Sequence, residues 1–537
     1  MNRRSFVHTA SSSLLALAGA VTSTSKGSSS LAASPSVTMN SRPDFPNLAM
    51  HELLEELHRG SITTERLTRE YLRRIEAMNI KGPRLRAVIC THPDAMAEAR
   101  RMDKERARGD VRGPLHGVPL LVKDNIDTRD IPTTAGSVLM ASHRPAADAP
   151  LVARLREEGA LVLGKTNLSE WANFRSTRSS SGWSSILGQT RNPHVLDRSP
   201  SGSSSGSAVA VAAGLCAAAI GTETDGSIVS PASSCGVVGF KPTVGLVPQD
   251  GIIPISATQD TAGPMARTVR DCALLMNILQ MPSRFDPLAP STAVSLPFPD
   301  HTSMLYPEVL RGKRIGVDAS YKNHLGEVVA VFEKSIDMLR VCGADVVEVT
   351  LFDTVRAHAG NKEWEVLLYE FRRDLNAYLA SSHAPVGTLA RLIEANTNDA
   401  RRCMPLFGQE IFVEADRATD DAPYRAALET TLGVRGLFDD AFAKDRLDAV
   451  VCVTSGPAWC IDPVNGDSPT SPSCSSPAAM AGFPHVTVPM GFVRGLPVGL
   501  SFMALANMDA QVLGYAYAFE QASKAMRAPA FASTVQG

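Results

Sequence analysis

Lys123 is the first residue whose position suggests chemistry. It directly follows the apolar run 117–122 (GVPLLV), which is typical of a buried strand that delivers polar residues at its end. Burial disfavours the charged form of a lysine and lowers its pKa, so Lys123 could act as a neutral amine base near neutral pH. An ordinary alternative is that Lys123 pairs with its neighbour Asp124.

Two serine-containing stretches could supply a nucleophile. Residues 198–214 (RSPSGSSSGSAVAVAAG) have six serines in their first ten positions and then run directly into small apolar residues, which a linker does not do. A Gly/Ser loop that enters a helix exposes backbone N–H groups suited to an anion or a polarised hydroxyl. Residues 221–228 (GTETDGSI) form a second polar turn, whose consecutive N–H groups could make an oxyanion hole around Ser227. Ser227 also fits an ordinary turn.

Two pattern matches offer other interpretations. Residues 159–166 (GALVLGKT) fit the P-loop pattern, but the residues between the glycines favour a strand, so we do not expect a nucleotide site. Residues 202–206 (GSSSG) fit the nucleophile turn of α/β-hydrolases, with Ser204 as nucleophile and His485 as the best placed base. The residues before this turn make a poor strand, so the α/β-hydrolase remains the alternative.

Together, these stretches resemble the amidase signature family. Lys123, Ser203 and Ser227 match the family's Ser–cis-Ser–Lys triad, and the two serines are 24 residues apart, as the family signature requires. The likeness covers nearly all of the chain after its N-terminal leader. It includes residues 117–126, 164–170, 239–243, 260–268 and 481–491, while residues 169–174, 221–227 and 367–371 are most similar to the peptide-amidase branch.

The resemblance implies a reaction. Neutral Lys123 accepts a proton from Ser203, Ser203 accepts one from Ser227, and Ser227 attacks an amide carbonyl to form an acyl-enzyme. The implied oxyanion hole consists of Thr224, Asp225 and Gly226. The expected substrates are primary amides, at the C-terminus of peptides or on amino-acid amides, and the products are an acid and ammonia. Neither a metal nor a cofactor is expected.

Substrate recognition is less defined by the sequence. The candidates for the acyl side of the site are Trp171, Phe174 and Trp183, although ordinary core aromatics explain them equally well. Asp225 stands where the family commonly has glycine, and a carboxylate there would discourage binding of a free C-terminal carboxylate. Other possibilities are an aryl, aliphatic or fatty-acid amide hydrolase, a subunit of a tRNA-dependent amidotransferase, or a binding protein on an inactive amidase scaffold.

The elements that position these residues alternate between helices and short apolar strands. Helices are predicted behind Ser61 and over residues 93–109, 151–158 and 207–220, and strands over 117–122, 161–163, 447–453 and 485–488. This alternation predicts a single large α/β domain with a mixed, largely parallel sheet covered by helices on both faces, the amidase signature fold. We place the domain at 45–530, with a core at about 85–300 and 440–505 and a helical cap at about 352–423.

Composition excludes several classes. The 537 residues include 53 Lys+Arg and 55 Asp+Glu without a basic block, which argues against nucleic acid as a partner. No apolar run beyond the N-terminus is long enough to span a membrane.

The nine cysteines are scattered without a C-x-x-C pair, so they indicate neither a zinc site nor a disulfide scaffold, although a Cys460–Cys474 pair stays open. We expect a monomer.

The N-terminus has the layout of an export signal. Residues 2–7 (NRRSFV) hold paired arginines, a weakly apolar stretch follows at 14–21, and a tract rich in small residues continues to about residue 35. This order is typical of a twin-arginine signal, and residues 18–20 (AGA) are candidates for cleavage. A disordered basic tail is the alternative. We therefore predict a leader at 1–35 and a periplasmic or secreted enzyme.

Overall fold

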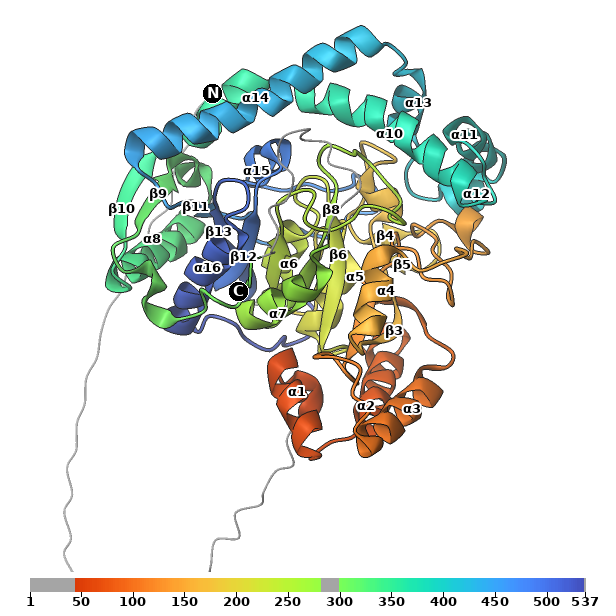
Figure 1. The fold of residues 1–537 in the computed structure, drawn as a ribbon. Coiled ribbons are helices and arrows are strands. Elements are labelled where there is room, and N and C mark those ends of the chain that lie inside the picture. The colour runs from red at the N-terminus through yellow and green to blue at the C-terminus, as the bar shows by residue number, and fades with distance from the viewer. Residues whose placement is uncertain (1–43, 282–298, 536–537) are drawn as a thin grey trace, which may run out of the picture. The chain divides into compact units, whose positions relative to one another are not determined.

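Eleven strands form one mixed sheet through the middle of the protein (Figure 1). The computed structural model describes residues 44–281 and 299–535, so the predicted leader at 1–35 lies outside the described residues. The strand order is β1-β3-β2-β6-β8-β7-β12-β13-β11-β9-β10. The strands span β1 Val88–Thr91, β2 Pro119–Lys123, β3 Leu161–Thr166, β6 Ala218–Glu223, β7 Val238–Lys241, β8 Thr261–Ala266, β9 Arg314–Asp318, β10 Asp345–Val349, β11 Ala449–Val453, β12 His485–Val493 and β13 Leu496–Met503. A separate two-stranded sheet pairs β4 (Trp183–Ser184) with β5 (Gly188–Gln189).

The sheet contains fewer parallel pairs than we expected. Strand β2 is parallel to β3 and β6, and β9 is parallel to β10 and β11. All other neighbouring strands of this sheet are antiparallel. These pairs are β1–β3, β6–β8, β8–β7, β7–β12, β12–β13 and β13–β11. Strands β12 and β13 form a hairpin around Arg494 and Gly495, and a direct hairpin yields an antiparallel pair without a crossover helix. The predicted mixed sheet is confirmed, whereas a mainly parallel one is not.

Helices cover the sheet and lie at its ends (Figure 1). The helices that precede or pack on the sheet are α1 Met50–Arg59, α2 Thr64–Ile75, α3 Ala95–Arg108, α4 Pro150–Glu157, α5 Ser205–Ala212, α6 Val229–Cys235, α7 Val269–Leu279, α8 Gly326–Val341, α15 Ser476–Ala481 and α16 Asp509–Ser523. Helix α5 is shorter than the predicted 207–220. It ends before Gly214, which adopts φ +63°, and residues from Ala218 onward pair with β2 and β8 instead.

A group of helices after β10 lies across one side of the sheet in Figure 1. These helices are α9 Leu351–Ala359, α10 Lys362–Ser381, α11 Leu389–Asn398, α12 Ala400–Cys403, α13 Glu410–Arg417 and α14 Asp421–Asp445. We call residues 351–445 the cap. Its buried side chains Leu367, Phe371 and Phe412 belong to one apolar cluster with Trp171 and Phe174 of the core, so the cap is packed onto the sheet domain.

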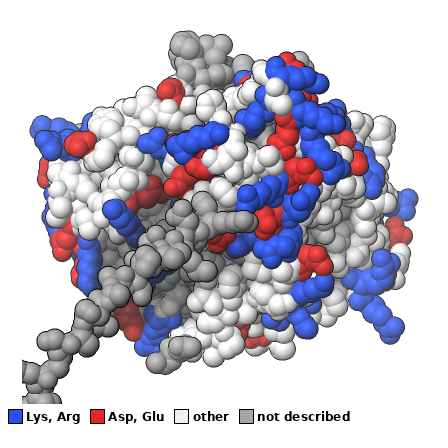
Figure 2. Space-filling model, turned by 90° about the horizontal axis from the view of Figure 1, so that it is seen from below, with Lys and Arg blue, Asp and Glu red and all other residues white. Residues whose placement is uncertain are grey.

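Charged side chains of both signs share the surface. On the face drawn in Figure 2, Lys and Arg side chains lie interspersed with Asp and Glu side chains. This mixture fits the nearly equal numbers of basic and acidic residues in the sequence.

Two further observations concern the described residues. None of their helices combines the length and the apolar character needed to cross a membrane. All nine cysteines are free thiols, and Cys460 is exposed whereas Cys474 is buried.

Candidate active site

The predicted lysine and serines meet at one edge of the sheet. Lys123 is the last residue of β2, whose parallel neighbour β6 ends at Glu223 and leads into the turn that holds Ser227. Ser203 lies in the loop before α5 and follows a cis peptide bond from Gly202. The carboxyl ends of adjacent parallel strands emerge on the same side, which explains why residues 104 positions apart come together.

A chain of hydrogen bonds connects the three side chains. The Nζ of Lys123 donates to the Oγ of Ser203 at 2.8 Å, and Ser203 Oγ donates to the Oγ of Ser227 at 3.0 Å. Lys123 also donates to the Oγ1 of Thr222 at 2.8 Å and to its carbonyl oxygen at 3.2 Å. Lys123 and Ser203 are fully buried, whereas Ser227 lines a cavity. This arrangement can carry a proton from Ser227 toward the amine.

The environment of Lys123 favours the neutral amine. Burial lowers its pKa to about 7, although the nearby carboxyl groups of Asp260 and Glu223 act in the opposite direction. An amine with this pKa is available as a base near neutral pH, because about half of it is unprotonated there.

The turn after β6 is held from both sides. The Glu223 carboxylate accepts the backbone N–H groups of Ile228 at 2.7 Å and Val229 at 3.0 Å. The backbone N–H of Ser204 donates to the carbonyl oxygen of Ser227 at 3.0 Å. Gly226 adopts φ +78°, and a Cβ there would lie 2.9 Å from the Oγ of Ser475, so a side chain would be strained. We call residues 224–227 the oxyanion turn, after the function predicted for it.

The cavity above Ser227 has a volume of about 410 Å³ and is lined by both the core and the cap. The core contributes Phe174, Thr224, Asp225, Ser227 and Ile255 among others, and the cap contributes Asn361, Glu363, Trp364 and Leu367. Apolar and aromatic walls around a few polar groups are typical of a small-molecule site. Asn361, Glu363 and Trp364 carried no signal in the sequence, because α10 has an ordinary amphipathic pattern.

Only one of the three predicted aromatic residues lines this cavity. The ring of Phe174 lies 5.3 Å from that of Trp364 and 4.9 Å from that of Phe371, measured between centroids. Trp171 packs edge-on against Phe412, and Trp183 packs against Phe407. Both tryptophans are buried, and neither is among the cavity residues. Their contacts therefore support the alternative interpretation that Trp171 and Trp183 are ordinary aromatic residues of the core.

Two carboxyl groups face the cavity. Asp225 accepts a hydrogen bond from the Oγ of Ser476 at 2.6 Å, and Glu363 accepts one from the Nε2 of Gln259 at 2.9 Å. Burial and the neighbouring Asp225 raise the pKa of Glu363 well above its usual range. Burial and this neighbour therefore disfavour the ionised form of Glu363.

The alternative nucleophile has different partners. The Oγ of Ser204 donates to the carbonyl oxygen of Thr222 and accepts its N–H, at 3.0 and 3.2 Å. The Nε2 of His485 is bonded to the Oγ of Ser501 at 2.6 Å, and burial lowers the pKa of this histidine to about 3. No hydrogen bond of the described residues joins His485 to Ser204. No group of three or more metal-ligating side chains occurs among the described residues either.

Comparison with known proteins identifies the family. A family model described as Amidase matches residues 66–513, which is most of the chain. The chain belongs to the amidase signature family. It is an amidase, a hydrolase that acts on amide C–N bonds, and the family predicted from the motifs is confirmed.

Individual relatives of the amidase differ in their described functions. It is 36% identical to a probable amidase of Arabidopsis thaliana over 516 residues, which cover 94% of this chain and 95% of that protein. It is 38% identical to a glutamyl-tRNA(Gln) amidotransferase subunit of Moorella thermoacetica over 491 residues, covering 89% and 97% of the two chains. Among solved structures, the native peptide amidase from Stenotrophomonas maltophilia is 48% identical, with a TM-score of 0.85 and coverage of 91% of this chain and 99% of that chain.

Proposed function

We propose that this amidase hydrolyses primary amides at the C-terminus of peptides and on amino-acid amides. The observation that carries the proposal is the hydrogen-bonded chain from Lys123 through Ser203 to Ser227, which ends at a cavity with aromatic walls. The similarity to a peptide amidase over nearly the whole length of both chains supports the same substrate class.

The proposed reaction has two halves. In the first, Lys123 accepts a proton from Ser203, Ser203 accepts the proton of Ser227, and the Oγ of Ser227 bonds to the amide carbon. The N–H groups of the oxyanion turn stabilise the negative charge on the former carbonyl oxygen, and one such donor is typically worth about 3 kcal/mol. Ser203 then passes a proton to the amide nitrogen and takes back the proton held by Lys123, the C–N bond breaks, and ammonia leaves an ester on Ser227.

In the second half, water replaces ammonia. The same relay removes a proton from the water as its oxygen bonds to the ester carbon. Ser203 returns a proton to the Oγ of Ser227 when the ester C–O bond breaks, Lys123 returns its proton to Ser203, and the free acid leaves. The relay begins and ends in the same protonation state, so the cycle needs no further reactant.

We also propose that Asp225 selects against the acid product. Its carboxylate lies in the cavity wall beside Ser227 and is held by Ser476. A substrate amide is neutral and can donate its N–H groups to Asp225, whereas a free C-terminal carboxylate would meet a like charge in a partly buried site.

A selectivity panel tests the substrate class. The purified protein is incubated with C-terminally amidated peptides, with the same peptides as free acids containing internal Asn and Gln, with an aryl amide and with a long-chain fatty amide, and ammonia and product masses are followed. Conversion of the C-terminal amides alone is the expected result. Preferential conversion of the aryl or fatty amide would assign the protein to another group of amidases.

We propose further that the protein is exported by the twin-arginine route, on the strength of Arg3 and Arg4 and the apolar stretch that follows. The test is to fractionate cells that produce the full chain or its Arg3→Lys, Arg4→Lys double variant. Export of the full chain and retention of the variant in the cytosol are expected. Equal distribution of the two would reject this route.

A further inference from the structure

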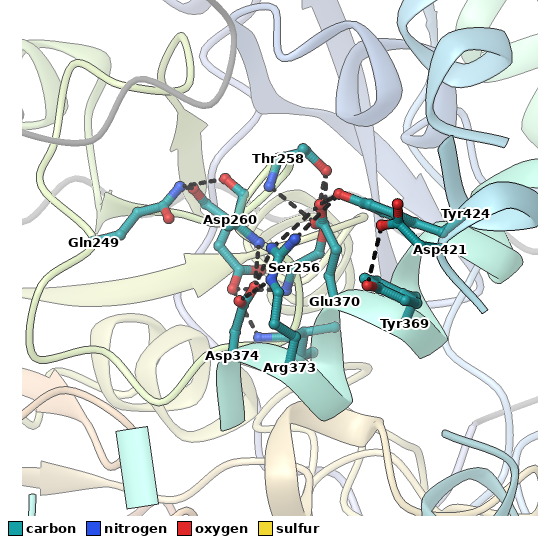
Figure 3. A network of polar contacts seen from close by, with 12 residues as sticks. Gln249, Ser256, Thr258, Asp260, Tyr369, Glu370, Arg373, Asp374, Asp421 and Tyr424 are labelled. Carbon is teal, nitrogen blue, oxygen red and sulfur yellow. Dashed lines mark hydrogen bonds and ion pairs between the residues drawn. The ribbon is translucent and has the colours of Figure 1, made fainter. Parts of the chain in front are cut away.

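A buried polar network joins Ser256, Thr258 and Asp260 to helix α10 of the cap (Figure 3), and Asp260 also contacts the oxyanion turn. Its middle part is the loop 255–260, which we call the linking loop. The loop precedes β8 and lies between the turn after β6 and the face of α10 that carries Glu370 and Asp374. The reaction proposed above gives none of these residues a direct part.

At the core end, Asp260 connects the oxyanion turn to the loop. The Oγ1 of Thr224 donates to one carboxylate oxygen of Asp260. The other oxygen accepts the backbone N–H groups of Ile255 at 2.7 Å and Ser256 at 3.0 Å. One buried carboxylate thus fixes both the side chain of a turn residue and the backbone of the linking loop.

At the cap end, the carboxylate of Glu370 accepts hydrogen bonds from Ser256 and Thr258 of the linking loop. Its Oε2 accepts the Oγ of Ser256 at 2.5 Å, the Oγ1 of Thr258 at 2.9 Å and the N–H of Thr258 at 3.2 Å. Its Oε1 accepts the hydroxyl of Tyr424 from α14 at 2.7 Å. Glu370 is fully buried, and hydrogen bonds from several donors offset the cost of burying its carboxylate.

A second connection runs alongside the first. The side chain of Gln259, in the same loop, donates from its Nε2 to the carbonyl oxygen of Thr224 at 3.3 Å and to Glu363 of α10 at 2.9 Å. The backbone N–H of Ala257 donates to Asp374 at 3.3 Å. The linking loop therefore contacts Thr224 at both its side chain and its backbone, and contacts α10 at three acidic residues.

The helix held in this way also lines the cavity. Glu363, Trp364 and Leu367 lie one to two turns before Glu370 on α10, and all three face the space above Ser227. Ile255 of the linking loop lines the same cavity. A displacement of α10 relative to the turn would change the distance between the cavity walls and the nucleophile, and small misplacements of this kind are costly in catalysis.

We propose that the linking loop holds the oxyanion turn and helix α10 in one fixed relative position, with Asp260 and Glu370 as its positioning residues. Asp260 orients Thr224 next to Ser227, and Glu370 seats the cavity-lining part of α10 above it. The consequences for turnover rest on the function proposed above, whereas the mechanical connection does not.

The test compares Glu370→Gln and Asp260→Asn with the control Glu394→Gln, which changes an exposed carboxylate on α11 of the same cap. Backbone hydrogen exchange is measured over 223–228 and 361–368, together with kcat and KM for an amidated peptide. In Glu370→Gln, an amide NH2 group replaces one carboxylate oxygen. This group cannot accept the hydrogen bonds that Ser256, Thr258 or Tyr424 donates to Glu370. We expect exchange to rise at least fivefold in both segments and kcat to fall about tenfold or more, with no change in the control.

The outcomes separate this inference from the proposed function. Faster exchange at 361–368 with unchanged exchange at 223–228 in Glu370→Gln would overturn the connection, whatever the activity. If the wild type releases no ammonia from peptide amides, the proposed function fails while the exchange result still decides the connection. Should Glu370→Gln not fold, Tyr424→Phe removes a single donor to Glu370, and smaller increases in both segments are expected; no increase in either would overturn the inference.

Discussion

The Nζ of Lys123 lies 2.8 Å from the Oγ of Ser203. The buried amine therefore contacts the serine of the cis peptide, and it reaches Ser227 only through that serine. In this geometry Ser203 has a donor on one side and an acceptor on the other, as a proton relay requires. Substitutions in the relay and in the cavity beside it test the role of each part.

Removal of either end of the relay should abolish turnover. Ser227→Ala removes the nucleophile and Lys123→Ala removes the base, so each is expected to lower kcat/KM at least about 10³-fold. His485→Ala should keep kcat within tenfold while its Tm falls, because Ser501 loses one of its buried hydrogen-bond partners. Steady-state ammonia release and thermal unfolding measure these effects. Loss of activity in the His485 variant at unchanged Tm would favour the α/β-hydrolase alternative.

Activity should depend on pH through Lys123. The base acts only when unprotonated, and its pKa is about 7, so kcat/KM should rise with pH through about 7 and level off above it. A profile that stays flat down to pH 5 would show that Lys123 is not the base.

A substitution at Asp260 tests independently whether Lys123 is the base. The charged forms of Asp260 and Glu223 raise the pKa of Lys123, while burial raises the pKa of Asp260 itself to about 7. Asp260 is thus ionised mainly above neutral pH, and Asp260→Asn removes the share of the Lys123 pKa that comes from this ionised form. The pKa of Lys123 should therefore fall modestly, and the acid limb should move to lower pH. Glu394→Gln should leave the limb in place. A fall in kcat without movement of the limb would limit Asp260 to a structural role.

Asp225→Asn should strengthen inhibition by the acid product. Asparagine keeps an oxygen for Ser476 and removes the negative charge, so the inhibition constant of the free peptide acid is expected to fall about fivefold or more. The KM for the amide should change less. Unchanged inhibition by the acid in this variant would remove Asp225 as the selecting group.

The aromatic residues should separate into two classes. Phe174→Ala and Trp364→Ala open the cavity wall, so each is expected to raise KM for peptides with a bulky residue beside the amide by about fivefold to tenfold. Trp183→Phe should lower Tm with little change in KM, because Trp183 packs against Phe407 and beneath Arg175 away from the cavity. A raised KM in Trp183→Phe would place this residue in substrate binding.

The sequence was informative where local chemistry was unusual. Lys123 follows an apolar strand and Ser227 lies in a polar turn between apolar segments, so each position stood out before any fold was known. The family spacing then linked Ser203 to Ser227. Burial of Lys123 and the hydrogen bonds among the three residues agree with that expectation of proximity.

Other features depend on packing between distant segments and left no local signal. Glu363 and Trp364 belong to an amphipathic helix, and only the docking of α10 onto the core decides which of its side chains meet the cavity. The choice between Phe174 and Trp183 is of the same kind, since buried aromatic residues in core and pocket look alike in a sequence. The direction of the strands could not be predicted fully either, because the alternation of helices and short apolar strands does not distinguish parallel from antiparallel neighbours.

The most direct test measures ammonia and free acid from one C-terminally amidated dipeptide, with wild type and Ser227→Ala side by side. Wild type should release one ammonia for each acid formed, through an acyl-enzyme that mass spectrometry of rapidly quenched samples locates on Ser227. The Ser227→Ala protein should show neither product nor adduct. Turnover by Ser227→Ala, or an adduct on Ser204, would contradict the proposed relay.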